Sequence, residues 1–480
     1  MCALARFWYL HGYWSEGRDW LRLALASSTA APTPEDLRRA RARALAGLAW
    51  LMDENGEDNP VYQESFRLYR ELDDRAGMAF ALRGMGATLV NQGEPEQARQ
   101  YLNEALELFR ALPDLWGIAV AQYNLGWLSY YRDDSDSAAA TWAESLQAFR
   151  QSGDRWGIAL ALGSLSYVDR LRGDYAHAVV LTQESLDRFR EIGDKAGIAT
   201  SLSRLGNVAF RRGDYRQAVA LIEEGIALQR ELGEQGGLAS ACSLLGQIAI
   251  YQGENDRAKA WLEESLVLSR EASDSISAAY TTGHLALANY NAGDLDRAAT
   301  LWQENLAQQR ANNERLGTGL ALNGLGLVAW RRGDLEAAQA QLEESLRLFK
   351  EVGDKRYIAI AHNHLGRLAH ERGDDLRAVA WCRAALDMFR ELGDRQGLME
   401  SLEGLSAAIG PTTQAARLLG AADGLRAMLG APRPPVERAS YARDLTALRQ
   451  ALSANAIEAA WREGQALPLE QLMTNQPPLP

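Results

Sequence analysis

The sequence predicts an all-α solenoid built from antiparallel helix pairs. Its main basis is a 40-residue repeat that keeps its register from about residue 38 to residue 397. In such an array each unit buries its apolar face against its neighbours, so no single core has to grow with chain length. Alanine recurs at one register of the repeat, at Ala98, Ala138, Ala178, Ala218, Ala258, Ala298, Ala338 and Ala378. Glycine recurs at another, at Gly86, Gly126, Gly206, Gly246, Gly326 and Gly366.

One unit, residues 194–233, shows how the repeat forms two helices. Asp194 is placed to cap a first helix, on which apolar residues recur at helical spacing. Gly213 ends that helix, since glycine tolerates the left-handed conformation after a helix C-terminus, and Asp214 can cap the second. Gly233 closes the unit. A Gly-Asp pair thus marks a turn every 20 residues, as at Gly153-Asp154, Gly173-Asp174, Gly193-Asp194 and Gly213-Asp214.

The small residues inside the unit have fixed offsets. Gly206 lies 12 residues before Ala218, which lies 7 before Gly225. Small side chains at these points let the two helices approach closely, so we interpret them as packing residues. The pattern resembles the tetratricopeptide repeat (TPR), with both helices extended. This resemblance implies a right-handed, TPR-like superhelical solenoid whose first helices line a concave face.

Both ends depart from the repeat, which predicts four segments. Residues 1–37 form a partial helical repeat and linker, residues 38–397 nine TPR-like repeats, residues 398–470 a C-terminal helical cap, and residues 471–480 a loose tail. In the cap we expect a compact Ala/Leu-rich helix pair from Gln414 to Leu429 and a last helical stretch from Val436 to about Gly464. The chain begins within a repeat, as if a segment preceded it.

The two ends also resemble a particular family. The opening FWYLHGYWSEG, residues 7–17, and the closing stretches AARLLGAA, residues 415–422, and AAWREG, residues 459–464, are similar to the sensor arrays of bacterial signalling ATPases of the STAND class. In that family an NTPase module precedes the array, and inducer binding to the array releases the ATPase for oligomerisation. The chain contains no phosphate-loop motif and no basic recognition helix. The resemblance therefore covers the sensor alone.

Composition excludes several partners and compartments. The net charge of −12 argues against binding the phosphate backbone of nucleic acid. No apolar run approaches the ~18 residues of a membrane span, and the N-terminus lacks a signal peptide, so we expect a cytoplasmic protein. The three cysteines are too scattered for a disulfide framework or a metal site, and we expect Cys242 and Cys382 to be buried.

Candidate ligand contacts come from comparing the first helices of the repeats. At the positions one, four and five residues after the glycine register, the side chains vary and include aromatic rings, guanidinium groups and amides. Such groups on one inner surface can stack on a ligand and hydrogen-bond to it. The alternative interpretation of each residue is packing between repeats or capping of a helix end. The candidates are Tyr130, Tyr167, Arg170, Asn207, Phe210, Arg211, Tyr251, Tyr290, Trp330 and Arg331.

The sequence pattern does not indicate a catalytic, cofactor or metal site. His362, His364 and His370 do not have the i, i+4 spacing of paired ligands on a helix. Paired glutamates such as Glu343-Glu344 recur at one register, which indicates a solvated convex face rather than an acid/base pair. We expect no enzyme and no cofactor.

The leading hypothesis is a bacterial sensor domain that recognises a peptide, protein or small-molecule inducer in its concave groove. The alternative is a free-standing TPR scaffold for protein–protein interaction. We also expect some self-association at the N-terminal end, where the partial repeat would leave Phe7, Trp8 and Trp14 partly uncovered.

Overall fold

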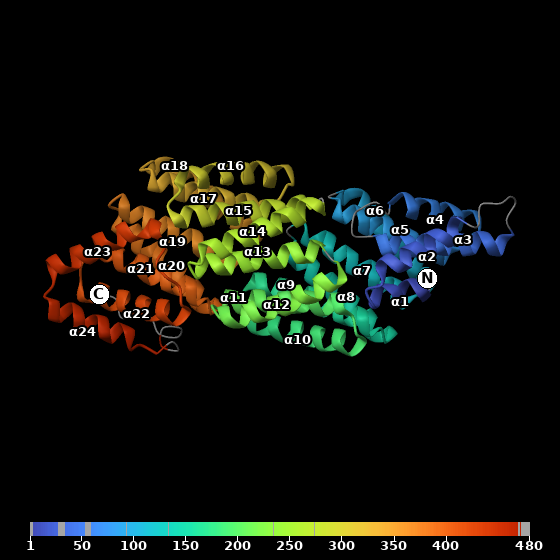
Figure 1. Ribbon diagram of the computed structural model, residues 1–480, viewed down its shortest axis with the longest axis horizontal. Coiled ribbons are helices and arrows are strands. Elements are labelled where there is room, and N and C mark those ends of the chain that lie inside the picture. The colour runs from blue at the N-terminus through green and yellow to red at the C-terminus, as the bar shows by residue number, and fades with distance from the viewer. Residues whose placement is uncertain are drawn as a thin grey trace. The chain divides into compact units, whose positions relative to one another are not determined.

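The computed structural model of the chain describes residues 3–26, 34–52, 59–92, 94–132, 134–233, 235–272, 274–468 and 471. In these ranges the protein contains 24 α-helices and one short 3₁₀ helix, and no strand (Figure 1). The predicted all-α solenoid of antiparallel helix pairs is confirmed. The helices belong to two compact units, and each is described by itself.

The first unit comprises Met1–Asp169, Ala176–Arg204 and Ala227–Glu234. Consecutive helices contact each other throughout its first eight helices. Its helices are α1 (Ala3–Leu10), α2 (Trp14–Ala26), α3 (Glu35–Met52), α4 (Asn59–Glu71), α5 (Arg75–Asn91), α6 (Pro95–Ala111), α7 (Leu115–Tyr130), α8 (Ser135–Ser152), most of α9 (Arg155–Arg172) and of α10 (Tyr175–Ile192), and parts of α11 (Lys195–Arg211) and α12 (Tyr215–Leu232).

The second unit comprises Arg170–Tyr175, Leu205–Ile226 and Gln235–Pro480. Besides the remainders of α9, α11 and α12 it contains α13 (Gln235–Tyr251), α14 (Asn255–Glu271), α15 (Ser275–Ala292), α16 (Leu295–Ala311), α17 (Arg315–Arg331), α18 (Leu335–Val352), α19 (Lys355–Glu371), α20 (Asp375–Leu392), α21 (Arg395–Ala408), α22 (Thr413–Leu429), η1 (Pro435–Glu437), α23 (Arg438–Ala451) and α24 (Ala454–Gln465).

The Gly-Asp pairs form the turns between helices. Gly353 has φ of +79°, in the left-handed region that an L side chain rarely adopts, and its N–H donates to the Phe349 carbonyl at 2.9 Å. Asp354 follows as the N-cap of α19, and its carboxylate accepts from the N–H groups of Arg356 and Tyr357. One dipeptide therefore ends one helix and begins the next, which keeps the 20-residue period.

The small residues allow the helices of a pair to pack closely. A Cβ added to Gly326 would lie 2.9 Å from Cγ of Leu342 on the facing helix α18. The recurrent alanines, such as Ala218 and Ala338, are completely buried. Cys242 and Cys382 are buried free thiols, as expected from their helical positions.

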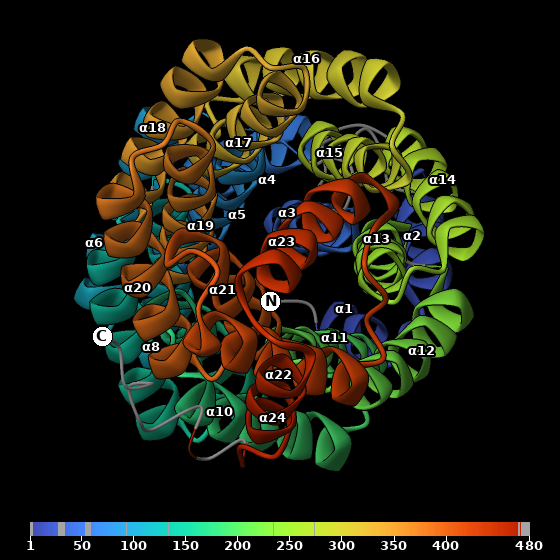
Figure 2. The same cartoon turned by 90° about the vertical axis from the view of Figure 1, so that its left-hand side faces the viewer.

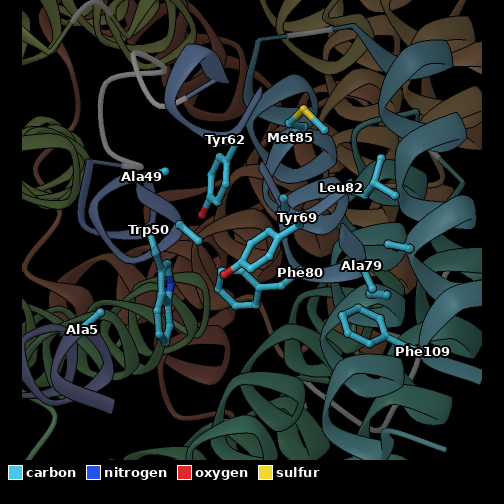
Figure 3. Packing of buried hydrophobic residues seen from close by; sticks show 14 of the residues in the cluster. Ala5, Ala49, Trp50, Tyr62, Tyr69, Ala79, Phe80, Leu82, Met85 and Phe109 are labelled. Carbon is cyan, nitrogen blue, oxygen red and sulfur yellow. The ribbon is translucent and has the colours of Figure 1, made fainter. Parts of the chain in front are cut away.

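The core of the first unit is rich in aromatic residues (Figure 3). Trp50, Tyr62, Tyr69, Phe80 and Phe109 project into it from successive helices, between small and aliphatic residues. Rings of this size bury much of the apolar surface that stabilises stacked repeats. Each ring packs on a neighbouring helix, so the core continues from repeat to repeat instead of forming one centre.

The chain ends differ in part from the expectation. Trp14 is buried against Leu48 and Leu51, whereas Phe7 is 47% exposed. In the cap, the expected pair from Gln414 to Leu429 is a single helix, α22, and the expected stretch from Val436 is interrupted. Ser453 caps α24 and thereby separates it from α23. Nearly all of the expected tail, residues 471–480, lies outside the described residues. Within the described residues no helix is both long and apolar enough to cross a membrane.

Candidate functional site

Contacts between distant repeats close a turn of the solenoid within the second unit. The Arg395 guanidinium lies 2.6 Å from the Asp214 carboxylate, and the Tyr215 hydroxyl donates to Oε1 of Gln396 at 3.1 Å. These pairs are 181 residues apart in sequence. They hold α21 against the turn that precedes α12, so the first helices of the intervening repeats face a common interior.

This interior contains a cavity of about 170 Å³, with room for on the order of ten water molecules. One stripe along each first helix lines it. On α15 the stripe consists of Tyr280, His284, Leu287 and Asn291, at the spacing i, i+4, i+7 and i+11 of one helical face. On α17 it includes Leu320, Leu327 and Arg331, on α19 Ile360, His364 and Arg367, and on α21 Glu400.

A segment of the cap forms another wall. Residues 431–437, between α22 and α23, are called the strap below; Figure 2 shows this red segment beside α13 and α15. Pro432 lies over Gly253, where an added Cβ would be 2.4 Å from its Cγ, and η1 contacts α15. The Arg426 guanidinium donates to the Ala431 carbonyl at 3.1 Å. Pro432, Pro434 and Glu437 all line the cavity.

In the described part of the chain the strap has two charged contacts with the solenoid: Arg433 lies 2.9 Å from the Glu403 carboxylate on α21, and Glu437 pairs with α19. The Glu437 carboxylate lies 3.0 Å from the Arg367 guanidinium. Burial by itself raises the pKa of Glu437, but the guanidinium groups of Arg367, Arg331 and Arg426 outweigh it and lower the pKa to about 2. The Glu437 side chain of the strap is therefore fully ionised near neutral pH.

Glu400, His284 and His364, which also line the cavity, have pKa values shifted toward their neutral forms. Burial, with Glu437 and Asp394 nearby, raises the pKa of Glu400 to about 7. Burial lowers the pKa of His284 to about 4 and, together with Arg367, that of His364 to about 3. His284 lies 3.0 Å from both Ser243 Oγ and Gln247 Nε2, which fixes the plane of its ring.

Four of the ten predicted contact residues line the cavity: Tyr251, Tyr290, Trp330 and Arg331. Arg331 donates from Nε to the Tyr290 hydroxyl at 3.1 Å, and its guanidinium lies 4.7 Å from the ring centre of Trp330. Tyr290 and Trp330 also belong to the buried core of this unit. Those two residues therefore combine packing with a place in the cavity wall.

Four more of the ten belong to the second unit but are not among the residues lining the cavity. Phe210 is buried, with its ring centre 5.5 Å from that of Tyr251. Arg211 donates to the Tyr357 hydroxyl at 3.3 Å and, more weakly, to Asn207. Phe210 and Arg211 thus each contact a residue of the cavity wall. Arg170 is half-buried near the end of α9.

Tyr130 and Tyr167 lie in the first unit and form an aromatic cluster. Their ring centres are 5.8 Å apart, and both contact Trp127. The Arg204 guanidinium lies 4.7 Å from the ring centre of Tyr167. Both tyrosines are half-buried. Two of the ten candidates thus belong to the first unit and eight to the second.

The residues that sequence comparison missed lie on the same helix faces as those it found. Tyr280, His284, Tyr357, His364 and Glu400 line the cavity but precede the glycine register. Extending the compared positions backwards by one and two helical turns would have selected Tyr280, His284, His364 and Glu400. The strap gives no such signal, because it lies outside the repeats.

The three C-terminal histidines have separate surroundings. The His362 ring centre is 4.7 Å from that of Trp381, Nδ1 of His364 is 2.9 Å from Asn323 Oδ1, and His370 contacts Asp375. They do not converge on one point.

Comparison with known proteins agrees with the fold. The tetratricopeptide-repeat family model matches residues 60–111, 197–271 and 275–351. The Rap conjugation gene regulator of the plasmid pLS20, in complex with the Phr* peptide, is similar in structure, with a TM-score of 0.51 and 13% identity over 71% of this chain and 96% of that one. A Rap protein complexed with competence and sporulation factor gives a TM-score of 0.50 and 12% identity over 72% and 99%. No curated protein sequence matches the chain.

At these identities the solved structures establish the fold alone. The chain is an all-α solenoid with tetratricopeptide repeats.

Proposed function

We propose that this protein is a non-catalytic sensor domain whose cavity in the second unit binds an inducer. The proposal rests on which segments of the chain form the cavity wall. First helices of successive repeats and the C-terminal strap line the same space. A ligand there contacts both, so it changes the free energy of any state in which the strap leaves the groove.

This arrangement gives a route from binding to signal. The strap continues directly into α23, so a movement of the strap moves the start of α23. Occupancy can then pass to a neighbouring module, in agreement with the resemblance of the chain ends to STAND-class sensor arrays. The two Rap structures were solved in complex with the Phr* peptide and with competence and sporulation factor. A peptide inducer is therefore included among the candidates.

Filling the cavity should abolish binding. Asn291 is a half-buried lining residue on α15, and no hydrogen bond of its side chain is among those described. Asn291→Trp is expected to lower the amount of co-purified ligand at least about tenfold, because the indole takes the ligand's volume. The protein would be isolated from its source cells, and the molecules released by denaturation would be identified by mass spectrometry.

The matched control is Gln308→Trp, which places the same indole on an exposed position of α16. The control should retain the ligand of the wild type. Equal recovery of the same molecule from wild type and Asn291→Trp would refute binding in this cavity. A partner protein lost with Asn291→Trp, without a small ligand, would instead favour the scaffold function.

A further inference from the structure

The arginines around the cavity are not equally neutralised. Arg356 lies 2.6 Å from the Asp394 carboxylate, Arg367 lies 3.0 Å from Glu437, and Arg426 lies 2.7 Å from Glu403. Arg331 is the fourth lining arginine. Among the described residues no carboxylate lies within ion-pair distance of it. Arg331 interacts electrostatically with Glu437, whose pKa it helps to lower. Two guanidinium groups, Arg331 and Arg367, therefore share one carboxylate.

The Arg331 side chain is fixed by its neighbours but has one hydrogen-bond donor without a partner. Its Nε donates to Tyr290, and the Trp330 ring supports its plane, while its buried Nη2 has no hydrogen-bond partner within the described part of the chain. A guanidinium group has five N–H donors, and leaving one buried and unsatisfied is unfavourable because it loses its hydrogen bonds to water. A ligand acceptor that reaches Nη2 would recover this cost.

The other lining residues indicate the chemical character of the rest of the ligand. Leu287, Leu327, Ile360 and the ring of Trp302 present apolar surface to the same cavity. His364 remains neutral, because its pKa is about 3. The cavity thus combines a fixed, under-compensated cation with apolar side chains from several helices.

We propose that the cavity binds a carboxylate attached to an apolar or aromatic body, with the carboxylate on Arg331. This inference rests on the proposed function and names the chemical class of its ligand. A planar guanidinium matches a carboxylate with two parallel hydrogen bonds, and stacking on Trp330 fixes its orientation before the ligand arrives. A free organic acid and the C-terminal residue of a peptide both supply this chemistry.

The test uses matched probes with the full chain. The probe 3-phenylpropionate carries the carboxylate, 3-phenylpropionamide has the same shape without charge, and phenethylamine carries a cation. Dissociation constants would be measured by isothermal titration calorimetry. The carboxylate is expected to bind about 10- to 100-fold more tightly than the amide, as a charge-assisted hydrogen bond predicts. Equal affinities of carboxylate and amide, or tighter binding of the amine, would overturn the proposal without requiring any variant.

Variants then assign the carboxylate to Arg331. Arg331→Gln is expected to remove the preference for carboxylate over amide. The control Arg332→Gln changes the next residue, whose guanidinium pairs on the surface with Asp296, and should leave the preference unchanged. A preference that survives in Arg331→Gln would contradict the assignment.

Two further experiments distinguish a free acid from a peptide as the source of the carboxylate, and the proposed function from the proposed ligand class. A tetrapeptide ending in Phe, with a free or an amidated C-terminus, tests whether a peptide carboxylate enters the cavity as well as the free acid. Asn291→Trp tests the location. One outcome is that the wild type binds carboxylate and amide with equal affinity and Asn291→Trp binds neither. In that case the cavity is the binding site but the ligand class is wrong. If carboxylate binding persists in Asn291→Trp, both proposals fail.

Discussion

Asp394→Ala should lower the free energy of unfolding of the second unit by about 3–5 kcal/mol. Asp394 is completely buried and serves two partners. One oxygen caps α21 by accepting from the Gly397 N–H at 2.9 Å, and the other accepts from Arg356 Nε at 2.6 Å. The alanine variant loses the cap and leaves the buried Arg356 guanidinium without its carboxylate. An unpaired buried charge costs more than a missing cap, which accounts for about 1 kcal/mol of this loss.

The repeat supplies a matched control. Asp194 has the same register five repeats earlier, caps α11, and accepts a hydrogen bond from the Trp156 indole at 2.9 Å. Asp194→Ala therefore removes the same cap and leaves a neutral donor unpaired instead of a cation. We expect a loss of about 2 kcal/mol.

Hydrogen exchange is the appropriate measurement, because a solenoid can open locally and need not unfold in one step. Amides of α19–α21 should lose protection in Asp394→Ala, and those of α9–α11 in Asp194→Ala. A loss in Asp394→Ala no larger than in Asp194→Ala would show that the charge of Arg356 is not the cause. The double variant Arg356→Met/Asp394→Ala should recover part of the stability.

The comparison of these two sites shows how far the sequence predicts the structure. The periodic Gly-Asp pairs predict where helices begin, and Asp194 and Asp394 are N-caps as the repeat implies. The contact of each across to the preceding repeat differs, Trp156 in one case and Arg356 in the other. Helix positions follow from local rules, so one sequence suffices to predict them. Contacts between repeats depend on which side chain occupies each register.

Contacts over longer distances were not predictable in this way. The pairs Arg395–Asp214 and Tyr215–Gln396 depend on the pitch of the superhelix, which sums small rotations between repeats. Without them the cavity has no closed interior. The candidate residues were consequently selected along the whole array, although only Tyr251, Tyr290, Trp330 and Arg331 line this cavity.

The strap escaped prediction for a related reason. Its sequence reads as a proline-rich link, and prolines alone predict neither a destination nor a contact. The break between α23 and α24 does have a local signal, since Ser453 is a favoured N-cap residue. Cap helices were thus predictable in part, whereas the docking of Glu437 on Arg367 required the structure.

Glu437→Gln should release the strap at neutral pH. The wild-type carboxylate has a pKa of about 2 in the folded protein, against an ordinary value of 4.5, so its ionised form is stabilised by folding. A depressed pKa contributes stability above about pH 4.5, and this contribution is lost as the pH falls toward 2. Glutamine has nearly the same shape but no charge. We expect the variant to destabilise strap docking by about 2–3 kcal/mol at pH 7, and the difference from wild type to shrink at pH 3.

Urea titrations at both pH values, followed by the protection of α23 amides, would measure the difference. Glu458→Gln is the control, because Glu458 forms an exposed pair with Arg462 on the neighbouring helix α24 and should change stability little at either pH. A destabilisation by Glu437→Gln that is the same at pH 7 and pH 3 would exclude the ion pair with Arg367 as its origin.

The same variant connects strap and ligand. In the wild type, Glu437 competes with any incoming carboxylate for the field of Arg331 and Arg367. Removing its charge leaves both guanidinium groups free to face the ligand, so Glu437→Gln should bind 3-phenylpropionate more tightly than wild type while its strap is less firmly docked. Carboxylate binding and strap docking would then oppose each other, and by linkage each must weaken the other to the same extent. Such a reciprocal effect is what a sensor needs if occupancy of the cavity is to move the cap.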